Sequence, residues 1–165
     1  MDEALQRLLD VAAVKDVQHR YCRGIDRRDF DLLRSCYHPD ATDNHGEFVG
    51  SVEEFIAYVE KGTLDFLSTN HFLCNQQVEV KGDTAWAEAY ALAYHRLPAG
   101  EDGKEKEWIC NSRFVDRFER RNGEWRIADR KVVVDSDRVQ TVEESWSDRI
   151  ALIARRDRTD PSYAR

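Results

Sequence analysis

The sequence predicts an α+β domain in which three helices come first and an antiparallel sheet follows. Three observations carry this prediction. Apolar residues recur at spacings of three and four in the first part of the chain, they alternate from about residue 69 to 135, and turn signals divide that second part. Helices followed by consecutive strands are typical of α+β proteins. With 165 residues, 41% of them hydrophobic, the chain is long enough for one domain with its own core.

The bulk composition narrows the possible partners. A formal net charge of −7 disfavours nucleic acid, because phosphate contacts require a basic footprint. No apolar run approaches the ~20 residues that cross a bilayer, and the first residues lack the basic and apolar regions of a signal peptide. We therefore expect a cytoplasmic protein without a membrane partner. The four cysteines form no CxxC pair, so we expect buried small side chains and neither a metal site nor disulfides.

The first helix is predicted from Asp2 to about Gly24. Its apolar residues recur at helical spacing, namely Leu5, Leu8, Leu9, Ala12, Val14, Val17, Tyr21 and Ile25. A second, short helix should begin after Asp29, a residue type favoured at helix N-termini, and end before Pro39. Its apolar residues are Phe30, Leu33 and Tyr37.

The third helix should begin at Ser51, because Ser51 and Glu54 have the spacing of a capping box. Its inner residues are Val52, Phe55, Val59 and Phe66. Strands are then expected from about residue 69 to 135, separated by turns at 81–83, 98–100 and 122–123. Beyond residue 135 the chain becomes polar, so we divide it into a domain at 1–135 and an exposed C-terminal arm at 136–165.

The Asn-Gly dipeptide at 122–123 is the type I′ hairpin turn and fixes a strand register. In that register Phe118 faces Ile127, and Val115 faces Arg130. Arg130 then lies on the face opposite to Phe114, Phe118 and Ile127. A β-bulge would exchange the two faces.

The stretch from residue 85 to 95 has alanine at every second position and ends in His95. In a strand these alanines share one face with His95, and the other face carries Trp86, Tyr90, Leu92 and Tyr94. A face of alanines leaves space above it. Either a ligand cavity or a closely packed first helix fills that space, and the residues alone leave both open.

Five residues are candidates for chemistry. Asp26 ends the first helix, where the dipole disfavours a carboxylate unless a cation or a histidine compensates it. The alternative interpretation of Asp26 is an exposed ion pair with a neighbouring arginine. His71 opens a strand and could be a core histidine, while His95 could reach water at a strand end. Tyr21 could pack in the core, and Arg130 could lie on the sheet surface. Together they should enclose the space above the alanines.

The chain resembles the nuclear transport factor two-like superfamily, in its SnoaL-like branch. The stretches that carry the resemblance are YCRGIDRRDFDLL, HPDAT before the first strand, NHFLCN and FVDRFERRNGEWRIADR, within about residues 5 to 135. The resemblance implies a cone-shaped barrel: a strongly curved mixed or antiparallel sheet with three N-terminal helices on its concave side. It is most similar to a group of small cofactor-free lyases that includes hexachlorocyclohexane dehydrochlorinase, scytalone dehydratase and bile-acid dehydratase.

In that group an aspartate at the end of the first helix pairs with a histidine that removes the substrate proton. By position, the motifs GID and TNHF give Asp26 and His71 these roles. RIADR places Arg130 where the dehydrochlorinase has an arginine. Tyr21 matches the proposed acid of the bile-acid dehydratase. AYHRL places His95 where scytalone dehydratase has a second histidine.

The resemblance therefore implies a cofactor-independent lyase, most similar to a dehydratase, acting on a small hydrophobic cyclic substrate. Where scytalone dehydratase has a tyrosine beside its aspartate, this chain has Ile25. Two alternatives stay open: an isomerase or polyketide cyclase that uses the same dyad, and a non-catalytic subunit like the small subunit of ring-hydroxylating dioxygenases. Relatives form homotrimers through the outer sheet face, and we expect the same here.

Overall fold

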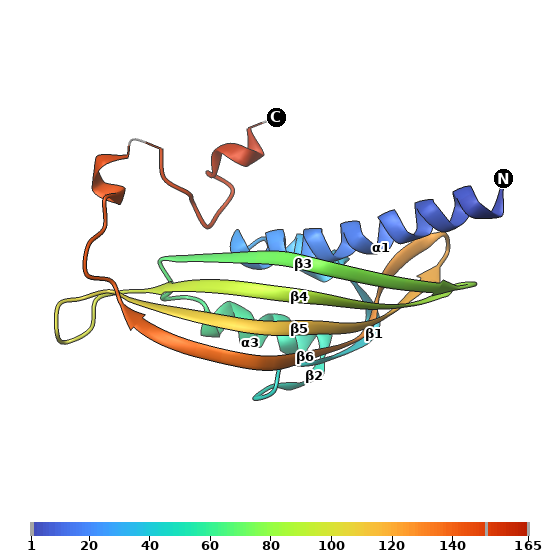
Figure 1. The fold of residues 1–165 in the computed structure, drawn as a ribbon, viewed down its shortest axis with the longest axis horizontal. Coiled ribbons are helices and arrows are strands. Elements are labelled where there is room, and N and C mark those ends of the chain that lie inside the picture. Colours follow the sequence, from blue (N-terminus) through green and yellow to red (C-terminus); the bar gives the residue numbers. More distant parts are fainter. Residues whose placement is uncertain (1, 151, 165) are drawn as a thin grey trace.

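A computed structural model describes residues 2–150 and 152–164 of the chain and has three α-helices and six strands in that part (Figure 1). The helices are α1 (Glu3–Asp26), α2 (Phe30–Ser35) and α3 (Val52–Gly62). The strands are β1 (Tyr37–Asn44), β2 (Val49–Ser51), β3 (Ser68–Lys81), β4 (Thr84–Leu97), β5 (Lys106–Arg121) and β6 (Glu124–Thr141). Two single 3-10 turns follow, at Ser147–Arg149 and Pro161–Tyr163.

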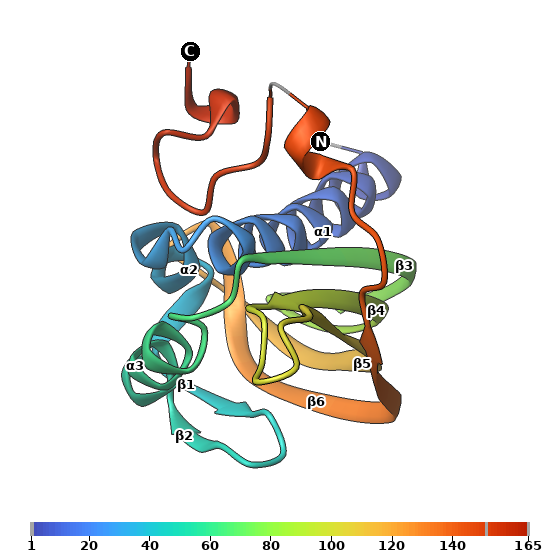
Figure 2. The ribbon, with the colours of Figure 1, turned by 90° about the vertical axis from the view of Figure 1, so that its left-hand side faces the viewer.

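The six strands form one mixed sheet in the order β2-β1-β6-β5-β4-β3, in which β1 runs parallel to β6 and the other neighbours are antiparallel. The sheet curves around α1, and α2 and α3 lie beside β1 (Figure 2). The predicted fold class, helices inside a strongly curved mixed sheet, is therefore confirmed. The sheet is open, however, with β2 and β3 at its edges.

The two strands before α3 are absent from the sequence prediction. Tyr37 begins β1 and does not belong to the second helix, which ends at Ser35. Pro39 lies inside β1, so the HPDAT segment is itself part of a strand. The missing backbone donor of proline is tolerated there because β1 shows a register irregularity between Tyr37 and Thr42 where it pairs with β6.

The predicted helix starts are confirmed. The first helix continues to Asp26, slightly beyond the predicted end at about Gly24. The Asp2 side chain accepts a hydrogen bond from the backbone of Ala4, and the capping box of Ser51 and Glu54 is present. The inner turns of α1 are buried, but its first turns project past the sheet and expose Leu5, Leu8 and Leu9. Helix α3 ends at Gly62, short of Phe66.

Gly24 brings α2 close to the end of α1. A Cβ atom at this position would lie 3.0 Å from the backbone nitrogen of Leu33, which is tighter than ordinary packing. The turn between the two helices therefore places Asp26 at the rim of the sheet, where α1 contacts β3.

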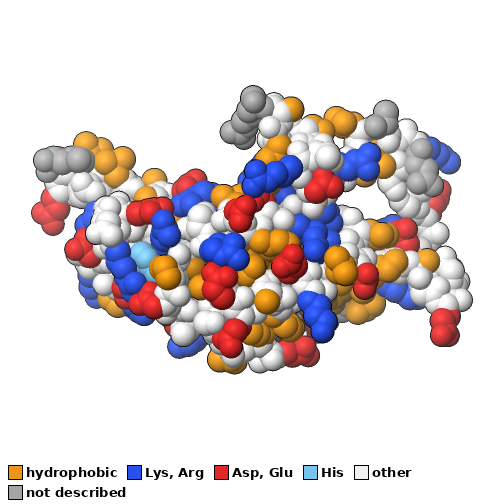
Figure 3. Space-filling view, turned by 180° about the vertical axis from the view of Figure 1, so that it is seen from behind, with side chains coloured by type: hydrophobic (Ala, Val, Ile, Leu, Met, Phe, Trp, Pro, Cys, Tyr) orange, Lys and Arg blue, Asp and Glu red, His pale blue; other side chains and the backbone are white. Residues whose placement is uncertain are grey.

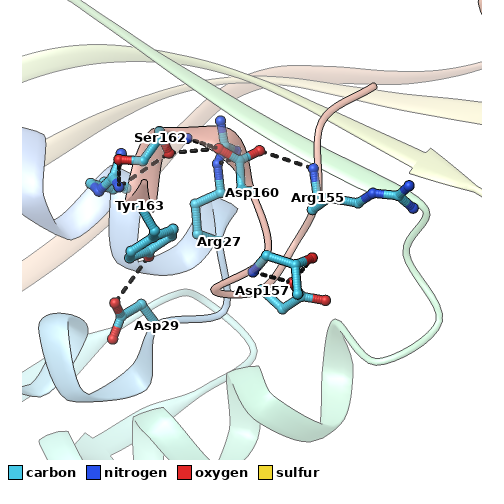
Figure 4. Close-up of polar contacts among 9 residues, drawn as sticks. Arg27, Asp29, Arg155, Asp157, Asp160, Ser162 and Tyr163 are labelled. Carbon is cyan, nitrogen blue, oxygen red and sulfur yellow. Dashed lines mark hydrogen bonds and ion pairs between the residues drawn. The ribbon is translucent and has the colours of Figure 1, made fainter. Parts of the chain in front are cut away.

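The polar C-terminal segment returns to the end of α1 (Figure 4). The hydroxyl of Tyr163 donates to Asp29 over 2.9 Å, and the guanidinium of Arg23 lies 4.5 Å from the Tyr163 ring centre. Asp160 is buried and lies 3.6 Å from Nε of Arg27. Most side chains of this segment are exposed as expected, but these anchors fix it against the helices. Strand β6 continues to Thr141, past the boundary at residue 135 that the sequence predicts.

The four cysteines differ in their exposure to solvent. Cys22, Cys36 and Cys110 are buried, whereas Cys74 is exposed on β3, so the prediction of four buried cysteines is wrong at that position. None of the helices in the described part of the chain combines the length and the apolarity that a bilayer crossing needs. On the side opposite to the view of Figure 1, acidic and basic side chains are interspersed (Figure 3).

The Asn-Gly turn at 122–123 and the pairing of Phe118 with Ile127 are confirmed, but a bulge follows at once. Arg117 pairs with Asp129, which leaves Ala128 as an extra residue in β6. Arg130 therefore faces Asp116 and not Val115 as the unbulged register predicts. The bulge moves the Arg130 side chain from the outer face to the inner face of the sheet.

Arg130 and Asp116 form an ion pair at the centre of the molecule. Nε and Nη2 of Arg130 each lie 2.7 Å from a carboxylate oxygen, and both side chains are fully buried. The guanidinium lies between the rings of Tyr21 and Phe114, with centroid distances of 3.9 and 4.3 Å. Gln18 of α1 donates a further bond of 2.9 Å to Asp116. The pair thus joins β5, β6 and α1.

We expect Asp116→Ala to lower the free energy of unfolding by about 3–5 kcal/mol, because it leaves the buried Arg130 charge without a partner. Urea denaturation monitored by circular dichroism measures this loss. The matched control is Asp135→Ala, which removes a half-exposed partner of Arg113 and should cost less than about 1 kcal/mol. Similar losses in the two variants would contradict the central role of the pair.

Candidate active site

Asp26 and His71 form a hydrogen-bonded dyad where the end of α1 meets β3. Nδ1 of His71 lies 2.7 Å from one carboxylate oxygen of Asp26, and the His71 backbone N–H donates to the other over 3.0 Å. Both side chains are nearly buried. The two donors compensate the carboxylate at the negative end of the α1 dipole. Because the carboxylate accepts from Nδ1–H, Nε2 of the neutral imidazole keeps its lone pair and can accept a proton.

The alternative interpretation of Asp26, an ion pair with a neighbouring arginine, does not match the contacts. Arg23 donates to Ser162, Arg27 lies beside Asp160, and Arg28 donates to Thr63. All three arginines are thus occupied by other groups, and the hydrogen-bond donor at Asp26 is His71.

His95 lies next to the dyad on the inner face of β4. Its ring centre is 5.6 Å from that of His71, and its ring stacks on Trp108 at 4.5 Å. Only 8% of His95 is exposed, which does not match the alternative interpretation of a strand-end residue that reaches water. Burial is the main cause that lowers the pKa of His95 from 6.5 to about 4, and the electrostatic effect of the nearby His71 is the second cause. The ring is therefore neutral at pH 7.

The tautomer of His95 follows from its backbone contact. Nδ1 lies 3.3 Å from the carbonyl oxygen of Trp108, and a carbonyl can only accept. Nδ1 therefore carries the proton, and Nε2 is an acceptor. Neutral His95 can hold a substrate hydroxyl by accepting its hydrogen bond, but it cannot donate from Nε2.

Tyr21 and Arg130 belong to a second buried cluster. The Tyr21 hydroxyl lies 3.2 Å from Nε2 of His45, whose Nδ1 is hydrogen-bonded to Asp43. Tyr37 donates to the same carboxylate over 2.5 Å. Burial raises the pKa of Tyr21 well above its ordinary value, which keeps the hydroxyl protonated. Within residues 2–150 and 152–164, no hydrogen bond links this cluster directly to the dyad.

The structure thus brings together three of the five predicted residues, Asp26, His71 and His95. Three further polar residues were missed in the sequence: Asp43, His45 and Asp116. Asp116 had a signal, because it lies between Phe114 and Phe118 on one strand face. Asp43 and His45 share a strand spacing of two, but they lie in a segment for which no strand was predicted.

An open groove of about 260 Å³ runs beside the dyad, between α1 and β3. It is lined by His19, Cys22, Arg23, Asp26, Arg27, His71 and Leu73. The alanines of β4 do not line this groove. Ala85, Ala87 and Ala91 are buried in the core cluster that also contains the inner residues of α1. Among the described residues, no group of three or more His, Cys, Asp or Glu side chains is arranged to hold a metal ion.

Comparisons with known proteins agree on the fold. The profile of the SnoaL-like domain family matches residues 6–131. A protein from Kribbella flavida superposes with a TM-score of 0.74 at 21% identity, covering 80% of this chain and 95% of the other. A hexachlorocyclohexane dehydrochlorinase (LinA type 2) gives 0.72 at 20% identity, covering 87% and 95%.

A third solved structure, described as a candidate scytalone dehydratase from Novosphingobium aromaticivorans, gives a TM-score of 0.72 at 17% identity and covers 84% of this chain and 93% of its own. None of the curated protein sequences matches the chain. At these identities the structural likeness establishes the fold, which confirms the resemblance found in the sequence.

The lowered pKa of His95 predicts a pH dependence of stability. Between pH 6.5 and 4 the unfolded chain protonates this residue while the folded protein keeps it neutral, so the free energy of unfolding should decrease as pH falls through that window. His95→Phe should show a smaller decrease. Urea unfolding of both proteins at pH 7 and pH 4.5 measures the difference. A His95 ring signal that titrates near pH 6.5 in NMR spectra would contradict the assignment.

Proposed function

The chain belongs to the family of SnoaL-like domains, and on that premise we propose that it is a cofactor-independent lyase of the dehydratase type. Its substrate would be a small hydrophobic cyclic molecule with an acidic C–H next to a carbonyl or a leaving group. The observation that carries the proposal is the 2.7 Å bond that orients His71 against Asp26. The solved dehydrochlorinase and the candidate scytalone dehydratase with the same fold support this reaction class.

In the proposed reaction, Nε2 of His71 removes the proton from the substrate carbon. Asp26 holds the imidazole in the required tautomer and stabilises the imidazolium that forms. The electron pair of the broken C–H bond forms the double bond, and the hydroxyl leaves as water after it receives a proton from the Tyr21 hydroxyl. His95 orients that hydroxyl by accepting its hydrogen bond at Nε2, a role that its neutral state supports.

Tyr21 and Arg130 are proposed to act on the oxygen side of the reaction. For Tyr21 the support is its contact with His45, because His45, which Asp43 orients, could return a proton to the phenolate once the imidazole is itself protonated. Asp116 balances the charge of Arg130 and occupies its Nε and Nη2 groups, so only the buried Nη1 group is left to bind the substrate. Nη1 is buried and has no hydrogen-bond partner among the described residues, and we propose that it donates to an oxygen of the substrate.

Two other functions share these observations. An isomerase or a polyketide cyclase would begin with the same proton removal, and the product alone distinguishes them. A non-catalytic subunit would not require the dyad, although an open groove such as the one beside His71 suits ligand binding too. The burial and the geometry of the dyad favour catalysis.

We also propose a homotrimer that covers the outer face of the sheet. This face carries several exposed apolar side chains on neighbouring strands, namely Phe72, Trp86, Tyr90, Val115 and Val133. Arg113 and Glu88 lie among them on the same face, so the contact would combine apolar and charged side chains. The apolar side chains of one subunit would then be buried against those of the next.

We expect His71→Ala and Asp26→Asn each to reduce turnover by at least ~100-fold while the fold is retained, as removal of a general base does. Exchange of the acidic C–H in D2O, followed by NMR over a panel of cyclic β-hydroxy ketones, reports the first step before the product is known. His19→Ala is the matched control, because His19 lines the same groove but lies outside the dyad. Near-normal exchange in a folded His71→Ala protein would refute the mechanism.

Light scattering at micromolar concentration should give three times the chain mass of 19.3 kDa. Tyr90→Glu should dissociate the trimer, because it places a charge within the buried apolar face. Tyr58→Glu serves as the control, since Tyr58 is equally exposed, at 45%, but lies on α3. A monomeric wild-type protein would contradict the proposal.

A further inference from the structure

Arg156 of the C-terminal segment lies near Asp26 of the dyad. Its Nη1 group donates to the carbonyl oxygens of Thr63 and Phe66, over 2.8 and 2.7 Å, in the connection between α3 and β3. The Phe66 ring meets the His95 ring edge-on at 5.4 Å. The contacts of Tyr163 with Asp29 and of Asp160 with Arg27 anchor the same segment at the end of α1 (Figure 4).

The rest of the Arg156 guanidinium is buried without a partner. Nε and Nη2 are both shielded from solvent, and neither has a hydrogen-bond partner within the described ranges. An unpaired donor of a charged group is costly to bury. In arginine, Nε–H and one Nη2–H point in the same direction and match the two oxygens of a carboxylate.

The same chain uses this edge of arginine to bind carboxylates at other positions. Arg130 binds Asp116 through Nε and Nη2. Arg34 binds Glu53 through the same two nitrogens, at 2.8 and 3.1 Å. Arg156 therefore presents the group that binds a carboxylate elsewhere in the molecule, held in place by two carbonyl oxygens at its other end.

The surrounding charges also favour an anion. Arg28 lies near Arg156, and the nearby carboxylate, Asp26, is already hydrogen-bonded to His71. Burial and Arg28 lower the pKa of Arg156 to about 10, so the guanidinium is charged at neutral pH. Thr69 adds a buried hydroxyl without a partner in the described chain, directly opposite His95 in the strand register.

We propose that Nε and Nη2 of Arg156 bind a carboxylate of the substrate, which makes the substrate a small cyclic carboxylic acid. The carboxylate is a fixed anchor and lies away from the carbon that loses its proton. The assignment of the ligand as substrate rests on the proposed lyase activity, whereas carboxylate binding itself does not. An anchor that contacts ground state and transition state alike should affect KM and leave kcat nearly unchanged.

The test compares the binding of cyclohexanecarboxylate and cyclohexanecarboxamide, measured by isothermal calorimetry on the full chain at pH 7. These two probes have the same ring and differ in charge. The wild-type protein should prefer the carboxylate by at least about tenfold, as expected for a charge-assisted pair. Arg156→Gln should remove the preference, and Arg156→Lys, which retains the charge without the planar edge, should keep part of it.

Arg155→Gln is the matched control, because Arg155 is the exposed neighbour whose side chain points away from the anchoring contacts (Figure 4). It should keep the full preference. The readout is the ratio of the affinities for the two probes, since a C-terminal segment that merely detaches would weaken the binding of both probes to the same extent. A wild-type protein without a preference, or an Arg156→Gln protein that retains it, would overturn the proposal.

His71→Ala separates this proposal from the lyase assignment. It should abolish proton exchange on the substrate and leave the carboxylate preference within about threefold of wild type. A wild-type protein that prefers the carboxylate but catalyses no exchange would refute the lyase assignment alone. A preference that disappears in His71→Ala would refute the anchor role of Arg156.

Discussion

The buried ion pair of Arg130 and Asp116 is the constraint around which the inner side of the sheet is organised. Two full charges can be buried together only when their hydrogen bonds are nearly all satisfied, and here the carboxylate, Gln18 and two aromatic faces supply the contacts. The pair fixes the register of β5 against β6 beyond the bulge. It also holds Tyr21 in place, and with it the orientation of α1 that brings Asp26 to β3.

The sequence predicted the helix starts, the hairpin turn and the Asp26 and His71 dyad, because each depends on local chemistry or on a short motif. It could not predict the face of Arg130. One extra residue, Ala128, reverses the alternation, and a bulge has no distinctive sequence signal when alanine provides it. The strand at Tyr37 was missed for a related reason: its pairing with β6 is long-range, and Pro39 locally suggests a helix end.

The two histidines beside the groove illustrate how environment divides the roles of identical side chains. Nδ1 of His71 donates to a carboxylate, which leaves Nε2 as the acceptor. His95 has only a carbonyl partner and an aromatic enclosure, which favour its neutral form. The sequence placed both histidines near one space, but their tautomers follow from a carboxylate on α1 and a carbonyl on β5 and therefore require the fold.

The charges around the dyad connect the two proposals. Once Asp26 is hydrogen-bonded to His71, the cations of Arg28 and Arg156 outnumber the anions at this rim. A bound carboxylate would balance one of them, while the anchor lies away from the reacting carbon. The polar C-terminal segment, which had no assigned role in the sequence, thereby becomes part of the chemistry of the site.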